Sequence, residues 1–284
     1  MPETDGLSLV PHVCMAELLC EAPVILTNAV RMAVTADIRE ALGGVTVLRS
    51  DEEALHLALD GYPVEYEEGQ VVPAQILFMS DASPKMNPDA RKMAEALETS
   101  LGQTWGWAEA RSVAAHARHT LLVTEFLATG LEPRQRAYVF PRVLYAAAKH
   151  IPCAALHFPK SQCLVDPEAF LALPPGDDER YSLQGLVNVR LFSVRDAEDE
   201  IVMDTLGLHV LGLPDLQCHR AGVNPDDLAA WLYSLAAYVA ETETVIDGGD
   251  TVDAFDGIPT RMEYEESLVE PRRVVLNLQP VPDA

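Results

Sequence analysis

Several kinds of sequence signal are missing from this chain of 284 residues. It contains no run of about 18 apolar residues, which is the length that a membrane-spanning helix needs. Its first residues, MPETDGLSLVPHVCMAELL, have neither the basic start nor the long apolar stretch of a signal peptide. We therefore expect a cytoplasmic protein that has no membrane partner.

Basic residues are scarce, with 20 Lys and Arg against 44 Asp and Glu, so the formal net charge is -24. Phosphate backbones are bound by clustered Lys and Arg, and this chain is therefore not expected to bind nucleic acid. The same excess of acids favours a protein partner with a basic surface, because opposite charges accelerate association. The alternative is that the charge serves only solubility.

The motifs of common catalytic sites are also absent. The sequence has no G-x-G-x-x-G and no phosphate-binding P-loop, so we expect no nucleotide cofactor, and no cofactor of another kind is expected. It also has no G-x-S-x-G, the motif that would present a serine nucleophile. Its five cysteines form no C-x-x-C pair, and their number is odd. Free thiols in a reducing compartment are the simplest interpretation.

Hydrophobic periodicity predicts an α+β fold with mixed sheets and packed helices. Over residues 1–173, which we interpret as one domain, strand-like and helix-like segments alternate, and this favours a ferredoxin-like arrangement. One further segment, residues 54–69, is compatible with a hairpin that turns near Asp60–Gly61, and a helical start of this segment is the alternative. The expected strands are 12–20, 45–50, 73–81, 119–128 and 153–158, and the expected helices are 26–44, 88–101, 132–150 and 166–173.

A linker is predicted at residues 174–182, where PPGDDER combines prolines, a glycine and charges that cannot form a core. Residues 183–284 then form a smaller antiparallel α+β domain. Its expected strands are 186–196, 200–212 and 272–280, and residues 247–257 are expected to form an acidic loop. The clearest helix is 224–241, because Asn224 can cap it and Pro225 suits its first position.

The segment DTLGLHVLGLPDLQCHR, residues 204–220, combines acids, histidines and a thiol with apolar residues. Its alternation predicts a buried strand, followed by a turn at 212–217. The competing interpretation is a catalytic cluster formed by Asp215, Cys218 and His219. Because Cys218 and His219 are adjacent, they would point to opposite faces of a strand, which argues against a nucleophile–base pair.

Two histidines, His116 and His119, stand three residues apart in HARH. On a helix they would share a face and could bind a metal, with Cys153, His157 and Cys163 as further ligands if the fold brings them close. The spacing does not match H-E-x-x-H, so the metalloprotease motif is absent. A metal site at these residues stays an alternative.

Acids are densest in residues 241–270, where ten Asp and Glu stand against one base, Arg261. The segment DGGDTVDAFDG lacks the spacing of a calcium-binding EF-hand loop, so a solvated acidic surface is the favoured interpretation. We expect this surface to contact the basic partner. The candidate contacts are Asp247, Asp250, Asp253, Asp256, Glu263 and Glu265.

Three segments together resemble a bacterial family known as domain of unknown function 4261. They are HARHTLLVTEF (116–126), DTLGLHVLGLPDLQCHR (204–220) and DGGDTVDAF (247–255), and the likeness is strongest within 200–280. The resemblance implies no activity and no catalytic residue. Such proteins are similar in style to the immunity and accessory proteins of bacterial toxin-delivery loci, which is an analogy and not homology.

The function expected from these observations is non-enzymatic partner binding, with neutralisation of a secreted bacterial toxin as the specific form. Two alternatives remain open. One is a hydrolase or metal-dependent enzyme that uses the His, Cys and Asp residues named above. The other is a structural or adaptor subunit of a secretion-associated assembly.

Overall fold

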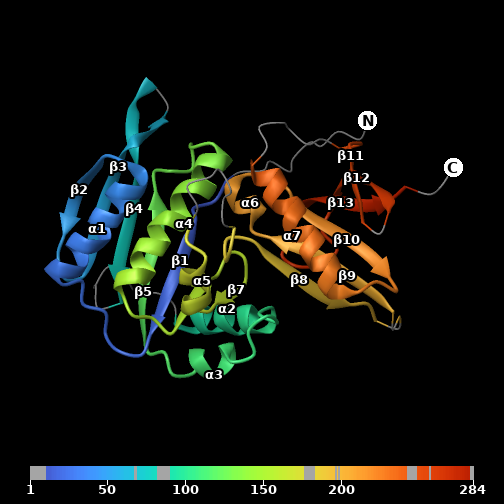
Figure 1. The fold of residues 1–284 in the computed structure, drawn as a ribbon, viewed down its shortest axis with the longest axis horizontal. Coiled ribbons are helices and arrows are strands. Elements are labelled where there is room, and N and C mark those ends of the chain that lie inside the picture. Colours follow the sequence, from blue (N-terminus) through green and yellow to red (C-terminus); the bar gives the residue numbers. More distant parts are fainter. Residues whose placement is uncertain are drawn as a thin grey trace. The chain divides into compact units, whose positions relative to one another are not determined.

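The computed structural model describes residues 11–66, 69–81, 90–175, 183–195, 197, 199–241, 248–255 and 257–281. The chain divides into two compact units (Figure 1). Val13–Leu186 form the N-terminal unit, and Val187–Ala284 form the C-terminal unit together with the first residues through His12. The α+β class is confirmed. Within the described ranges, no helix has the length and apolar character needed to cross a membrane.

The N-terminal unit is built on a seven-stranded sheet in the order β2-β3-β4-β5-β1-β6-β7. Every pairing in this sheet is antiparallel, and β1 lies between β5 and β6. The arrangement thus differs from the ferredoxin-like layout, in which the two central strands run parallel. The strands are β1 (Met15–Cys20), β2 (Val45–Ser50), β3 (Ala54–Glu65), β4 (Val71–Ser80), β5 (His119–Phe126), β6 (Ala155–Phe158) and β7 (Cys163–Val165).

Strand β3 continues through Asp60–Gly61, where the sequence predicted a turn. The pairing of β3 with β4 shifts register between Leu59 and Pro63, so these residues form a bulge inside one long strand. A bulge accommodates the turn-prone residues while the strand goes on. The chain reverses later, after β3 ends at Glu65.

Helices cover both faces of this sheet. Helices α1 (Asn28–Leu42) and α4 (Pro133–His150) lie side by side in Figure 1, and α5 (Pro167–Ala172) contacts α4. On the other face, α2 (Ala90–Gly102) contacts β6 and β7, and α3 (Ala110–Ala114) contacts β6. Successive side chains of a strand point to opposite faces of the sheet. The side chains of β1 therefore alternate between these two helix-covered faces.

Local chemistry explains where the long helices begin. Helix α1 is capped by Thr27, whose side chain accepts from the backbone N–H of Val30. Helix α4 begins with a capping box formed by Glu132 and Gln135, with a proline in its first turn. Pro141 lies inside α4 without dividing it. A buried ion pair then fixes α4 to β5, since Nη2 of Arg136 lies 2.6 Å from Oε2 of Glu125.

The C-terminal unit contains a six-stranded sheet in the order β11-β12-β13-β10-β9-β8. Strands β10 and β13 are parallel, and the other pairs are antiparallel. Helix α7 (Pro225–Glu241) lies across β8, β9 and β10 (Figure 1). The strands are β8 (Asn188–Ser193), β9 (Glu200–Leu206), β10 (Asp215–Ala221), β11 (Thr251–Phe255), β12 (Ile258–Glu266) and β13 (Val274–Pro280).

Several predicted boundaries in this unit need correction. The strand predicted for 200–212 ends at Leu206 and is followed by a one-turn helix, α6 (Leu208–Leu211). The turn predicted for 212–217 is over by Asp215, where β10 begins, because Gly212 ends α6 in the left-handed region with φ 90°. The acidic loop predicted for 247–257 includes β11. Most of the predicted linker, 174–182, lies outside the described residues.

Candidate functional site

A buried network of charged side chains occupies the centre of the C-terminal sheet. Asp204 on β9 and Asp215 on β10 are both 0% exposed. Arg190 on β8 binds Asp204 with two hydrogen bonds, from Nε to Oδ1 at 2.9 Å and from Nη2 to Oδ2 at 2.6 Å. Arg273, which precedes β13, donates to Oδ2 of Asp204 at 2.7 Å and to Oδ2 of Asp215 at 2.8 Å. The four side chains therefore connect four segments of this sheet.

Asp215 is satisfied on both carboxylate oxygens. Its Oδ1 accepts from the backbone N–H of Leu208 at 2.9 Å, and its Oδ2 also lies 2.8 Å from Nδ1 of His209. Burial alone would raise the pKa of Asp215, but the hydrogen bonds and charges of His209 and Arg273 outweigh it and lower that pKa below 3.8. Asp215 is thus held as a carboxylate.

His209 is more exposed than the four charged members of this network, since 18% of its side chain is exposed against 9% of that of Arg273. A carboxylate that holds the Nδ1 of a histidine is the arrangement that orients a general base in hydrolases. Among the residues that the structure describes, no hydroxyl or thiol is hydrogen-bonded to the His209 ring. The residues of the predicted catalytic cluster do not converge, because Cys218 is fully buried while His219 is exposed and contacts Glu200 at 2.8 Å. Burial also raises the pKa of Cys218 to about 11.

The segment that contains both aspartates and Arg273 has a match among known families. Residues 204–279 match the model of the family DUF4261, a domain of unknown function. The match lies within the C-terminal unit. No curated protein and no solved structure matches the chain.

The DUF4261 segment includes most of the buried charge network, and Arg190 lies outside it. The sequence indicated this segment, yet it did not reveal the two arginines as partners of the aspartates. One feature of the sequence could have indicated such partners, namely two acids within apolar strand segments. Carboxylates that are buried in this way require compensating charges. The network's geometry indicates a role in fixing strand positions.

The predicted partner-binding acids divide into those with described side chains and those without. Glu263 and Glu265 lie two residues apart on β12, and 39% of the Glu263 side chain is exposed. Glu265 is exposed, and both its oxygens are held by amides, from Asn277 at 2.9 Å and from Gln279 at 2.8 Å. Asp250 is exposed and precedes β11. Asp253 lies on β11 with no described side chain, and Asp247 and Asp256 lie outside the described residues.

The predicted histidine pair does not share a helix. Helix α3 ends at Ala114, His116 follows in a turn, and His119 begins β5, so the helical spacing on which the prediction rested does not apply. Nδ1 of His119 lies 3.2 Å from Oδ2 of Asp81, and Nδ1 of His116 lies 2.7 Å from the carbonyl oxygen of Ser112. Among the residues that the structure describes, no three or more His, Cys, Asp or Glu form a group that could hold a metal.

The N-terminal unit contains a second buried polar chain that the sequence did not predict. Nδ1 of His157 lies 2.8 Å from Oε2 of Glu17, and its Nε2 lies 2.9 Å from Oγ of Ser100. The order Ser–His–Glu is that of a hydrolytic triad. Ser100 is nevertheless 0% exposed within helix α2 and does not line the adjacent cavity, so a substrate carbonyl has no path to its hydroxyl.

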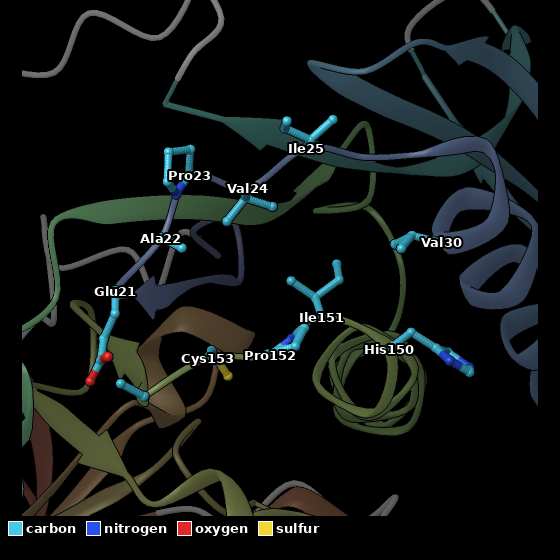
Figure 2. A pocket seen from close by; sticks show the side chains of 11 residues that line it. Glu21, Ala22, Pro23, Val24, Ile25, Val30, His150, Ile151, Pro152 and Cys153 are labelled. Atoms are coloured by element: carbon cyan, nitrogen blue, oxygen red, sulfur yellow. The ribbon is translucent and has the colours of Figure 1, made fainter.

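A larger cavity of about 450 Å³ lies between the segment after β1 and the segment after α4 (Figure 2). Its walls are mainly apolar, with Val24, Ile25 and Ile151 among them. The ring of His150 points away from Ile151 in Figure 2, and its Nε2 contacts Asp37 at 2.8 Å. Burial raises the pKa of the lining thiol of Cys153 to about 12, so this thiol is protonated and a poor nucleophile.

Proposed function

We propose that this protein binds a protein partner with a basic surface, and that the exposed acids of β12 take part in the contact. The observation that carries the proposal is the pair Glu263 and Glu265, which share one face of β12 in the unit that holds the DUF4261 segment; Glu265 is exposed, and 39% of the Glu263 side chain is exposed. The net charge of -24 likewise favours a partner with a positively charged surface. Acidic surfaces of this kind accelerate the encounter with basic proteins.

The face that carries these acids is distinct from the apolar face of the same strand. Met262 on β12 and Leu278 on β13 are register partners, and both are fully buried. Glu263 and Glu265 lie on the opposite side by strand alternation. Register pairs Glu263 with Asn277, whose amide holds Glu265, so the carboxylates belong to one polar layer across β12 and β13.

The fixed position of Glu265 favours recognition over a purely solubilising role. Two side-chain amides hold its carboxylate, so less side-chain entropy is lost when a partner's Lys or Arg approaches. An acid that served only solubility would gain nothing from such support. The specific form of the proposal is an immunity role, in which the partner is a secreted bacterial toxin with a basic surface.

The test is a charge reversal on β12. Wild-type protein and the Glu263→Lys/Glu265→Lys variant are used to capture proteins from lysate of the native host, and the association rate of each with the captured partner is then measured at low and high salt. We expect association to be roughly tenfold slower for the variant at low salt. The difference should shrink at high salt, because ions screen charges in solution.

The matched control reverses two exposed acids of the N-terminal unit, Glu40→Lys/Glu52→Lys, and changes the net charge equally. If both double variants slow association equally, the effect belongs to net charge and the β12 site is refuted. Equal association rates for the wild-type protein and the β12 variant would contradict the proposal outright. Thermal unfolding of all three proteins confirms that each is folded.

A further inference from the structure

The short segment Pro11–His12 packs on helix α6 of the C-terminal unit, to which His12 itself belongs. The backbone N–H of His12 donates to the carbonyl oxygen of Val210 at 3.0 Å. Pro11 lies beside the glycine that ends α6, since a Cβ built on Gly212 would come within 3.4 Å of the proline ring. These contacts hold His12 against α6, although the two segments are far apart in the sequence.

This packing makes two imidazole rings neighbours. The ring centroids of His12 and His209 lie 6.0 Å apart, and the ring planes make an angle of 69°. His12 is exposed, and 18% of the His209 side chain is exposed. A small ion in solution can therefore reach both rings.

The ring of His209 is fixed from its buried side. Its Nδ1 lies 2.8 Å from Oδ2 of Asp215, which is fully buried and whose pKa is lowered, so this carboxylate is charged. A carboxylate only accepts hydrogen bonds, and Nδ1 therefore carries a proton. Nε2 is then the ring nitrogen that can bind a metal, and among the described residues none is hydrogen-bonded to it. Histidines that bind metals commonly have a carboxylate in this position, because it orients the ring and makes the opposite nitrogen more basic.

We propose that His12 and His209 together bind a divalent transition-metal ion such as Zn²⁺. The protein ligands are Nε2 of His209 and one ring nitrogen of His12, and Asp215 positions the first of them. This site is independent of the acidic pair on β12, so either proposal can fail without the other.

The spacing of the two rings fits a shared metal. A zinc–nitrogen bond is about 2.0–2.1 Å long, so a ring centroid lies roughly 3 Å from a metal bound to that ring. Two imidazoles on one metal then have centroids roughly 4.5–6.5 Å apart. The observed separation of 6.0 Å lies within this range.

The donor set determines the class of metal. Imidazole nitrogens suit Zn²⁺, Ni²⁺ and Cu²⁺, whereas Mg²⁺ prefers oxygen ligands. The described residues contain no group of three or more metal-binding side chains, so water would occupy the remaining positions on the ion. With only two protein ligands, binding should depend strongly on each ring. The metal displaces any proton from the nitrogen that it binds, so the site does not require one protonation state of the free rings.

The experiment titrates the full-length protein with zinc chloride at pH 7.5, by calorimetry and by nitrogen-15 NMR of the imidazoles. We expect one equivalent of Zn²⁺ to shift Nε2 of His209 and a ring nitrogen of His12, while Nδ1 of His209 stays protonated. Magnesium chloride should produce neither heat nor shifts. Zinc binding that leaves both rings unchanged would show an adventitious ion only and would overturn the proposal, as would the absence of binding.

Two substitutions each remove one ligand. His12→Ala and His209→Ala should each weaken Zn²⁺ binding at least tenfold, and the double variant should bind no more tightly than either. His12 is exposed, so His12→Ala remains informative if His209→Ala does not fold. A variant with affinity equal to that of the wild type would overturn the proposal.

The matched controls replace two other exposed histidines, His116→Ala and His219→Ala. His116 contacts the carbonyl oxygen of Ser112, and His219 contacts Glu200, so neither belongs to the proposed site. Both controls should bind Zn²⁺ within twofold of the wild type. Equal losses for all four single variants would show that zinc binds to surface histidines in general, and this result would refute the site at His12 and His209.

Discussion

Arg273 and Asp215 lie 58 residues apart in the sequence and form an ion pair of 2.8 Å within the C-terminal sheet. The Asp215 side chain is fully buried, and that of Arg273 is 9% exposed. Arg273 also contacts Asp204 at 2.7 Å and the carbonyl oxygen of Thr205 at 2.8 Å. One arginine therefore compensates two buried carboxylates.

Replacement of Arg273 by methionine should strongly destabilise the C-terminal unit. Removing one partner of a buried pair leaves an uncompensated charge, and we expect the free energy of unfolding to fall by about 3–5 kcal/mol. Urea unfolding followed by fluorine NMR of fluorotryptophan-labelled protein gives the measurement, because Trp231 on α7 reports on this unit alone.

The neighbouring Arg272 supplies the control for that substitution. Its side chain is 56% exposed and its contact with Glu270 lies at the surface. Surface pairs contribute little, so Arg272→Met should change the free energy of unfolding by less than about 1 kcal/mol. Similar losses for both variants would show that the buried network does not carry the stability of this unit.

Acid should weaken the C-terminal unit through Asp215. Its pKa is lowered from 3.8 in the folded protein, so the unfolded chain binds the proton more readily. The stabilisation is therefore fully present above pH 3.8 and is lost as the pH falls below that value through the folded pKa. Urea midpoints measured from pH 6 to pH 2 should fall more steeply for the wild type than for Asp215→Asn. Parallel curves would contradict this assignment.

Local sequence chemistry was enough to predict several elements. Helix α7 begins at Pro225 after Asn224, whose side chain accepts from the backbone N–H of Asp226 at 2.8 Å. The capping and the apolar spacing both lie within the segment itself, so nothing distant was needed. Strands β4 and β5 were predictable for the same reason, because their apolar character is local.

The elements and sites that were missed depend on distant contacts. The strand-like alternation of side chains in residues 202–211 continues past Leu206, although the strand ends there. The helix that follows depends on Gly207 and on the hydrogen bond from the backbone N–H of Leu208 to Asp215. The Glu17–His157 contact joins residues 140 positions apart. Spacing in the sequence carries no information about such a pair. The charge pattern predicted solvent access for Glu263 and Glu265, because exposure of acids is a local tendency, and their role in partner binding stays a prediction.

The cysteines should react slowly in the folded protein. Burial raises the pKa of Cys20 and of Cys218 to about 11, and that of Cys153 and of Cys163 to about 12. At pH 8 only about one thiol in a thousand, or fewer, is then the reactive thiolate. Iodoacetamide labelling followed by intact mass should be roughly a hundredfold slower for folded than for urea-unfolded protein. Rapid native labelling of any of these four would argue for a reactive cysteine.

The close approach of Gly185 to Phe158 gives a prediction for the N-terminal unit. Gly185 has φ 80°, and a Cβ built on it would overlap the aromatic ring of Phe158, which is itself buried. The carbonyl oxygen of Gly185 also accepts from the hydroxyl of Ser161, so the backbone has little freedom to move away. We expect Gly185→Ala to reduce the free energy of unfolding by about 2 kcal/mol or more.

Gly102→Ala is the matched control, because nothing lies within 4 Å of a Cβ at that position on α2, and it should be neutral or stabilising by up to about 1 kcal/mol. Fluorotryptophan resonances of Trp105 and Trp107 follow this unit during urea unfolding, and equal midpoints for the two variants would refute the role assigned to Gly185.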